Sequence, residues 1–170
     1  MLDTLTIATQ RTSAPRLPGI NFAKLEFGRT FADHMLVVDY RDGQWQEPHI
    51  VPYADMNVSP ANSAIHYGQS IFEGMKAYKN ADGDVSLFRP LDNFRRFNAS
   101  ARRMCMPELP EDVFLQGILQ LIRLDSGWVP TAEGSALYIR PFMFATDAML
   151  GVRPSESYRF MVITCPVGLY

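Results

Sequence analysis

Residues 66–78 read His-Tyr-Gly-Gln-Ser-Ile-Phe-Glu-Gly-Met-Lys-Ala-Tyr. Aromatic residues, two glycines and a carboxylate are mixed here, which is poor material for a plain core. The segment continues as a strand from Met75 to Lys79, and residues 80–84 (Asn-Ala-Asp-Gly-Asp) give a turn signal before a returning strand at 85–88. The stretch therefore predicts an antiparallel hairpin, and its glycines suit turns or close backbone approach.

Two helices are predicted after the hairpin. The first runs from about Leu91 to Met104 with Pro90 near its first position, and apolar residues at three- and four-residue spacing define its buried face. The second opens at Pro110, carries acids in its first turn and ends at Gly127. The predicted buried positions are Phe94, Phe97, Ala101 and Met104 on the first helix, and Phe114, Ile118, Leu121 and Ile122 on the second.

Three further strands are predicted outside this region, at residues 35–40, 135–144 and 159–165, with a loop at 146–157. Short turns join neighbouring strands, so antiparallel pairing is expected to dominate. The predicted class is α+β, with an antiparallel twisted sheet and flanking helices in a two-layer sandwich.

The length of 170 residues suits one domain. We expect residues 1–20 to be an N-terminal extension, residues 21–165 to be the domain, and residues 166–170 to start an interdomain linker. Ending there is natural for a domain boundary and unnatural for a complete enzyme.

Composition narrows the class of partner and the compartment. A net charge of −2 argues against nucleic-acid binding. No apolar run is long enough to span a bilayer and no secretory signal is visible, so no membrane partner and a cytoplasmic location are expected. Cys105 and Cys165 read as buried free thiols. The three histidines are isolated and no metal-ligand spacing occurs, so no metal is expected.

Charged residues offer candidate chemistry, with a structural alternative beside each. Five arginines lie in residues 89–103, where they form either an anion site or a solvated helix face. Arg140 shares a strand face with Tyr138 and serves either a pocket or an ion pair with an acid such as Glu73. Glu73 itself reads as a catalytic carboxylate or as a hydrogen-bonding partner of a backbone turn.

Several blocks in order resemble the branched-chain amino acid aminotransferases, which are pyridoxal-phosphate enzymes of fold type IV. These blocks are residues 66–78, Leu-Phe-Arg-Pro at 87–90, Cys-Met-Pro at 105–107, Leu-Tyr-Ile-Arg-Pro at 137–141, Leu-Gly-Val at 150–152 and Cys-Pro-Val-Gly at 165–168. The resemblance covers the chain from residue 27 onward. It implies the small N-terminal domain of such an enzyme.

The resemblance also implies roles for particular residues. Arg96 matches the arginine that contacts the phosphate of pyridoxal 5'-phosphate. Tyr138 and Arg140 match the pair beside the substrate, where the arginine meets the side-chain carboxylate of glutamate. Phe27, Phe72 and Tyr170 match the hydrophobic side-chain pocket. The residues that match the part of the pocket completed by the neighbouring subunit of a homodimer are Tyr67, Leu150 and Val152.

The implied reaction is ping-pong transamination between leucine, isoleucine or valine and 2-oxoglutarate, which yields a branched 2-oxo acid and glutamate. None of Lys24, Lys76 and Lys79 matches the Schiff-base lysine, which the family carries in a C-terminal domain. No catalytic residue is therefore expected in this chain, and the chain alone is predicted to be inactive and not to hold the cofactor covalently. Two alternatives stay open: a D-amino acid aminotransferase or aminodeoxychorismate lyase-like enzyme, and a non-catalytic binding or dimerisation module.

Overall fold

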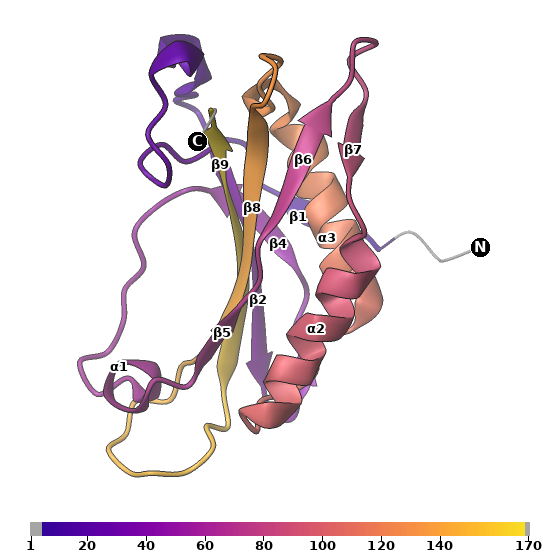
Figure 1. Cartoon of the computed structure of the whole chain (residues 1–170). Helices are drawn as coiled ribbons and strands as arrows, with labels where there is room; N and C mark the ends of the chain where they lie inside the picture. Colours follow the sequence, from indigo (N-terminus) through magenta and orange to yellow (C-terminus); the bar gives the residue numbers. More distant parts are fainter. Residues whose placement is uncertain (1–4, 169–170) are drawn as a thin grey trace.

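The computed structural model describes residues 5–168. Within that range nine strands form one sheet, and two long helices lie against one of its faces (Figure 1). The order across the sheet is β1-β4-β2-β9-β8-β6-β7, with β3 paired to β2 and β5 paired to β8. The strands are β1 (Ala8–Thr9), β2 (His34–Arg41), β3 (Gln44–Trp45), β4 (His49–Pro52), β5 (Ser70–Phe72), β6 (Met75–Lys79), β7 (Val85–Leu87), β8 (Ala136–Ala145) and β9 (Tyr158–Val167), and the helices are α1 (Ser63–Tyr67), α2 (Pro90–Arg103) and α3 (Glu111–Leu124), with 3₁₀ turns at Leu17–Gly19, Phe22–Lys24 and Ser126–Trp128.

The predicted α+β class is confirmed. β6 and β7 pair antiparallel as the hairpin signal indicated, and the long strands β8 and β9 pair antiparallel along their whole length. The exception is the short β1, which runs parallel to β4. Antiparallel pairing therefore dominates, and short turns join β2 to β3 and β6 to β7.

Strand β8 explains how the sheet acquires two different faces. Its side chains alternate, so one set faces the helices and is fully buried, while the other set is only half-buried on the opposite face. The buried set includes Leu137, Ile139 and Met143. The half-buried set includes Tyr138, Arg140, Phe142 and Phe144.

The core forms where the helices meet the sheet. Phe97 of α2 and Phe114 of α3 are fully buried and contact Phe160 of β9, with ring centroids 5.5 and 6.0 Å away. Gly117 allows α3 to approach β2 closely, since a Cβ there would lie 2.6 Å from a methyl group of Leu36. Burial of these aromatic side chains supplies a large hydrophobic contribution to stability.

Three sequence-based details were wrong. Met104 is 37% exposed, because α2 ends at Arg103 and the chain leaves the helix before Met104 can pack. Cys105 is exposed rather than buried, since it lies in that departing turn with φ of 55°. The second helix ends at Leu124, and Gly127 lies instead in the 3₁₀ turn Ser126–Trp128.

The segment before residue 20 is packed along the body. Ile7 lies in the core, and the N–H of Thr12 donates to Nε2 of His34 at 3.0 Å. The Arg16 N–H donates to Asp33 at 2.9 Å, and the Arg16 guanidinium donates to the carbonyl of Ala32. At the other end, β9 extends past position 165 to Val167. The domain boundaries expected from the sequence stay a prediction.

Candidate functional site

Glu73 and Arg96 form a bidentate charged pair beside the hairpin. The two residues lie on the β5–β6 connection and on α2, and two hydrogen bonds of 2.6 Å join Nε and Nη2 of Arg96 to the two carboxylate oxygens. The Asn93 amide also donates to Glu73 at 3.0 Å. Burial alone raises the pKa of Glu73, but the hydrogen bonds from Arg96 and Asn93 outweigh it and hold that pKa below its ordinary value.

This pairing settles whether Glu73 forms an ion pair with Arg140, which the sequence left open. Glu73 is not the partner of Arg140, and the Glu73 N–H instead donates to the carbonyl of Pro141, which ties the carboxylate to the sheet. The Arg96 side chain is 66% exposed, whereas that of Glu73 is only 7% exposed. The arginine therefore presents its outer edge to the surface while its inner edge is held.

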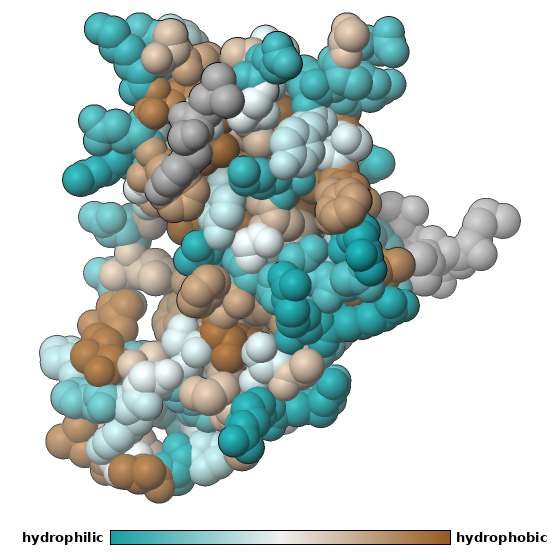
Figure 2. Space-filling view, viewed as in Figure 1, coloured by the Kyte–Doolittle hydropathy of each residue, from teal (hydrophilic) through white to brown (hydrophobic). Residues whose placement is uncertain are grey.

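A surface hollow of about 470 Å³ lies next to Arg96. Lys76, Arg89 and Arg96 line it together with a single acid, Asp92, so its charge is positive. Figure 2 shows hydrophilic side chains gathered over α2 beside apolar groups of the sheet face. Guanidinium and ammonium groups around one hollow suit a phosphate group. The donor set therefore fits the phosphate end of pyridoxal phosphate.

Tyr138 and Arg140 form a second cluster on the half-buried face of β8. Nη2 and Nε of Arg140 donate to the Tyr138 hydroxyl at 2.7 and 3.2 Å. The guanidinium also lies 4.3 Å from the ring centroid of Phe72, and the Phe27 ring meets Tyr138 edge-on at 5.3 Å. Within residues 5–168 Arg140 has no carboxylate partner, so its charge is balanced only by ring faces and a hydroxyl.

A small, mostly apolar cavity of about 210 Å³ opens between this cluster and the segment before β2. Its lining residues are Phe27, Gly28, Phe31, Tyr138, Arg140, Ile163, Thr164 and Cys165. Burial raises the pKa of the Cys165 thiol. The structure thus brings together four of the predicted substrate residues: three line the cavity, and Phe72 joins them through Arg140.

The other predicted residues gather at the opposite end of the sheet. Tyr67 ends α1, and its hydroxyl accepts a hydrogen bond of 2.7 Å from the backbone N–H of Gly151. Leu150 and Val152 flank that glycine and are 68% and 91% exposed. Figure 1 places α1 and the β8–β9 loop together, far from the segment that carries Phe27. Tyr170 lies outside the described residues.

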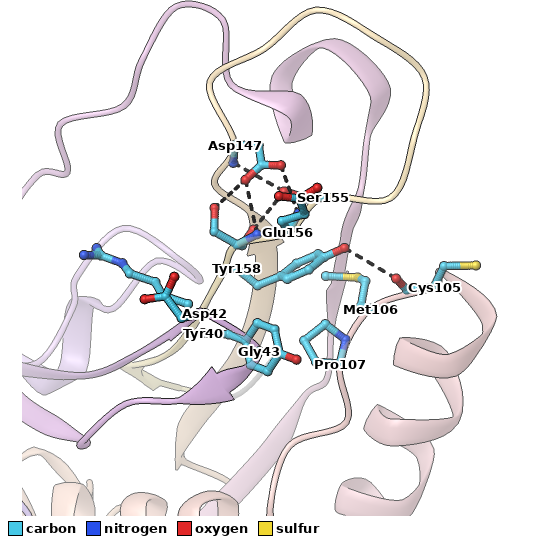
Figure 3. Close-up of a pocket in the computed structure, with 12 residues that line it drawn as sticks. Tyr40, Asp42, Gly43, Cys105, Met106, Pro107, Asp147, Ser155, Glu156 and Tyr158 are labelled. Carbon is cyan, nitrogen blue, oxygen red and sulfur yellow. Dashed lines mark hydrogen bonds between the residues drawn. The ribbon is translucent and has the colours of Figure 1, made fainter.

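Sequence reasoning missed one cavity of about 800 Å³. It lies between the β2–β3 turn, the end of α2 and the β8–β9 loop (Figure 3). The Tyr158 hydroxyl donates to the carbonyl of Cys105 at 3.4 Å across it, and burial raises the pKa of Tyr158. Asp147 is already satisfied there by Ser157 and Glu156 N–H groups. None of the predicted site residues lines this cavity.

A buried His34–Asp125 pair was also missed, because the two residues are far apart in sequence. Nδ1 of His34 lies 2.7 Å from Asp125, and Nε2 accepts from Thr12. Nε2 therefore holds the N-terminal segment against the body, while Nδ1 fixes the ring on the residue that follows α3. Within the described residues no group of three or more His, Cys, Asp or Glu could hold a metal ion, and no helix is long and apolar enough to cross a membrane.

Comparison with known proteins gives one consistent family. No protein-family model matches. The chain is 49% identical over 149 residues to "Branched-chain-amino-acid transaminase 1" of Bacillus subtilis, covering 87% of this chain and 42% of that protein. It is 46% identical over 166 residues to "Branched-chain-amino-acid aminotransferase 2" of the same organism, covering 97% of this chain and 46% of that protein.

Solved structures agree with the sequence relatives. The branched-chain aminotransferase of Escherichia coli superposes with a TM-score of 0.56 at 26% identity, over 79% of this chain and 39% of that one. The enzyme of Thermoproteus uzoniensis, solved with norvaline, gives a TM-score of 0.58 at 20% identity over 79% of this chain and 41% of that one, which shows the fold alone.

The proteins that both kinds of comparison find similar to this chain are aminotransferases. More narrowly, the chain is a homologue of the branched-chain-amino-acid aminotransferases. It spans less than half the length of the curated relatives it matches.

Proposed function

We propose that this chain is the substrate-pocket and dimer-forming domain of a branched-chain aminotransferase, in which the sheet and its two helices form a two-layer sandwich. The observation that carries the proposal is the Tyr138–Arg140–Phe72 cluster, because it sets one uncompensated guanidinium against apolar walls. Such a pocket serves both halves of a transamination between leucine, isoleucine or valine and 2-oxoglutarate.

The apolar walls would receive the branched side chains. Phe27 and Phe72 are exposed in this chain and become partly covered when an aliphatic group lies against them. Burying such a group contributes about 1.5 to 3 kcal/mol. Arg140 would receive the side-chain carboxylate of glutamate or 2-oxoglutarate, which avoids the cost of burying an unpaired charge.

Arg96 would hold the phosphate of pyridoxal phosphate at the hollow on α2, with Arg89 and Lys76 adding positive charge. When bound, this cofactor supplies the electron sink that lets an amino acid exchange its amino group with a keto acid. We further propose that residues 1–170 alone neither catalyse this exchange nor hold the cofactor covalently. The support is that Lys76 lies in the phosphate hollow and Lys79 donates to the carbonyl of Ser126.

A chimera tests the substrate class. This chain replaces the matching stretch of the Bacillus subtilis transaminase, and amino transfer from leucine, isoleucine, valine and D-alanine to 2-oxoglutarate is measured. Activity with the three branched substrates and none with D-alanine is expected. Arg140→Leu should reduce the 2-oxoglutarate half-reaction far more than the leucine half-reaction. Activity on D-alanine alone would instead support the related D-amino acid aminotransferases.

We also propose that Tyr67, Leu150 and Val152 meet a second copy of the chain in a homodimer and complete its pocket. The support is the exposure of Leu150 and Val152 on a loop that Tyr67 holds in place. Sedimentation of the Leu150→Asp/Val152→Asp variant tests this. We expect it to shift toward monomer, whereas Leu119→Asp, which charges an exposed position on α3, should not.

A further inference from the structure

Electrostatic attraction for an anion would by itself favour a neutral residue at the position of Glu73. Its carboxylate is nearly buried, and it lies directly behind the arginine to which the proposed function assigns a phosphate. A negative charge there lowers the attraction of Arg96 for any anion. If the Glu73–Arg96 pair favours phosphate binding, it must do so by something other than electrostatic attraction.

Geometry supplies that benefit. A guanidinium has five N–H donors. Glu73 accepts two of them, from Nε and Nη2, which leaves three (five minus two) on the outer edge. A bidentate Arg–carboxylate pair fixes both the position and the plane of the guanidinium. The three outer donors consequently face the hollow with little freedom left to lose.

The carboxylate is itself held from several sides. Oε2 accepts from Asn93 at 3.0 Å and from the Gly74 N–H at 3.3 Å, and the Glu73 N–H donates to Pro141 of β8 at 2.9 Å. Asn93 is 9% exposed. A buried and satisfied carboxylate does not swing away with solvent, so it serves as a fixed support for an otherwise exposed arginine.

We propose that Glu73 is a positioning residue, which together with Asn93 fixes Arg96 so that its outer edge binds the phosphate of the cofactor. This inference rests on the proposed function, since it takes the phosphate as the ligand of Arg96. It adds that the support behind the arginine strengthens binding in spite of its negative charge. In this role Glu73 contacts neither the substrate nor the reacting atoms.

A pair of charge-matched variants separates positioning from simple electrostatics. Glu73→Gln and Asp92→Asn each remove one negative charge near Arg96, and Asp92 lines the same hollow while bonding only Arg89 and Arg95. Electrostatics alone predicts that both variants bind phosphate more tightly. Positioning predicts opposite signs, with Glu73→Gln about three- to tenfold weaker and Asp92→Asn unchanged or up to about fivefold tighter.

The probes are inorganic phosphate and pyridoxamine 5'-phosphate, whose amine cannot form an imine with surface lysines. Calorimetry on the 170-residue chain gives Kd for each variant. The Arg96 Nε–Hε NMR signal, assigned with Arg96→Lys, gives a ligand-free readout. In the wild type it should be shifted downfield and exchange slowly, and in Glu73→Gln it should lose both properties while far-UV circular dichroism stays unchanged.

Asn93→Ala provides a second variant in case Glu73→Gln does not fold. It keeps every charge, removes one support of the carboxylate, and should weaken binding in the same direction by a smaller factor. If the wild-type chain binds neither probe, the assignment of Arg96 to phosphate in the proposed function is overturned together with this inference. If the wild type binds and both Glu73→Gln and Asn93→Ala bind equally well or better, only the positioning role is overturned.

Discussion

The hydroxyl of Tyr67 accepts a hydrogen bond from the backbone N–H of Gly151 at 2.7 Å, which ties α1 to the loop between β8 and β9. The neighbours of Gly151 in sequence are exposed apolar residues. Tyr67 therefore helps to hold a loop whose apolar side chains beside Gly151 are exposed and not packed in the core. The bond is exposed, so its contribution is local rather than global.

We expect Tyr67→Phe to loosen this loop with little effect on the rest of the fold. One neutral hydrogen bond contributes about 0.5 to 1.5 kcal/mol. Amide hydrogen exchange at Gly151 should accelerate, while exchange in β8 and the urea midpoint should barely change. Tyr78→Phe is a control, because Tyr78 is an exposed tyrosine on the distant strand β6. Unchanged exchange at Gly151 would contradict the role given to Tyr67.

Gly74 sets the position of Tyr138. A Cβ at residue 74 would lie 2.3 Å from the Tyr138 hydroxyl and 3.1 Å from the ring carbon that carries it. Gly74→Ala should therefore displace the ring and break the Arg140–Tyr138 hydrogen bonds. Because these bonds lie on a half-buried face, we expect a loss of about 1 kcal/mol in the free energy of unfolding.

A double-mutant cycle checks this cause. In a Tyr138→Phe background the hydroxyl is already absent, so Gly74→Ala should cost less than it does in the wild type. Urea denaturation of the four proteins gives the coupling energy, which is expected to be about 0.5 kcal/mol or more for residues in contact. Additive losses would show that the backbone at Gly74, and not its contact with Tyr138, matters.

Much of the fold follows from patterns that a single sequence displays. Alternation along residues 135–144 predicted β8 and placed Tyr138 and Arg140 on one face, which is confirmed. Asp-Gly at 42–43 is a local turn signal, and the two residues have φ of 54° and 76°. Local chemistry decides such features, so no knowledge of distant residues is needed.

The partner choices of charged residues were not predictable in the same way. Glu73 lies near Arg140 in the sheet, but it pairs with Arg96 because α2 crosses that end of the sheet. Only the packing of α2 on the sheet decides between the two arginines. His34 and Asp125 are likewise joined by tertiary folding. The exposure of Cys105 and Met104 depends on where α2 ends. The end of a helix is the feature that a sequence pattern predicts least reliably.

The carboxylate of Asp33 holds the N-terminal segment through hydrogen bonds whose contribution to stability depends on pH. Its carboxylate accepts from the Trp128 indole N–H at 3.0 Å and from Arg16. Burial raises the pKa of Asp33, but the hydrogen bonds from Arg16 and Trp128 outweigh it, and the net pKa is lowered. A lowered native pKa means that this stabilisation is complete above the unfolded value of about 3.9 and is lost as the pH falls through the native pKa.

We therefore expect Asp33→Asn to lower the free energy of unfolding by about 1 to 3 kcal/mol at neutral pH. The difference from the wild type should persist down to about pH 4 and shrink below it. Urea denaturation followed by circular dichroism between neutral and acidic pH measures both. Asp55→Asn, at an exposed position, should leave the curve unchanged. A difference that stays constant through the acid range would contradict the assignment.

Thr164 carries the one buried side-chain polar atom in residues 5–168 that has no hydrogen-bond partner. The residue is 2% exposed on β9, and its backbone carbonyl, not its hydroxyl, accepts from Ala32. An unpaired hydroxyl in a core costs free energy, whereas valine has the same shape without that group. Thr164→Val should therefore raise the free energy of unfolding by about 1 kcal/mol.

Thr164→Ala distinguishes the polarity of this side chain from its volume. Removing a buried methyl together with the hydroxyl leaves a small cavity, so this variant should lose about 1 kcal/mol relative to Thr164→Val. Urea midpoints with unchanged slopes would place both effects on the folded state. A less stable Thr164→Val protein would mean that the hydroxyl has a partner in solution, and the cavity beside Cys165 would then be the place to look for an ordered water.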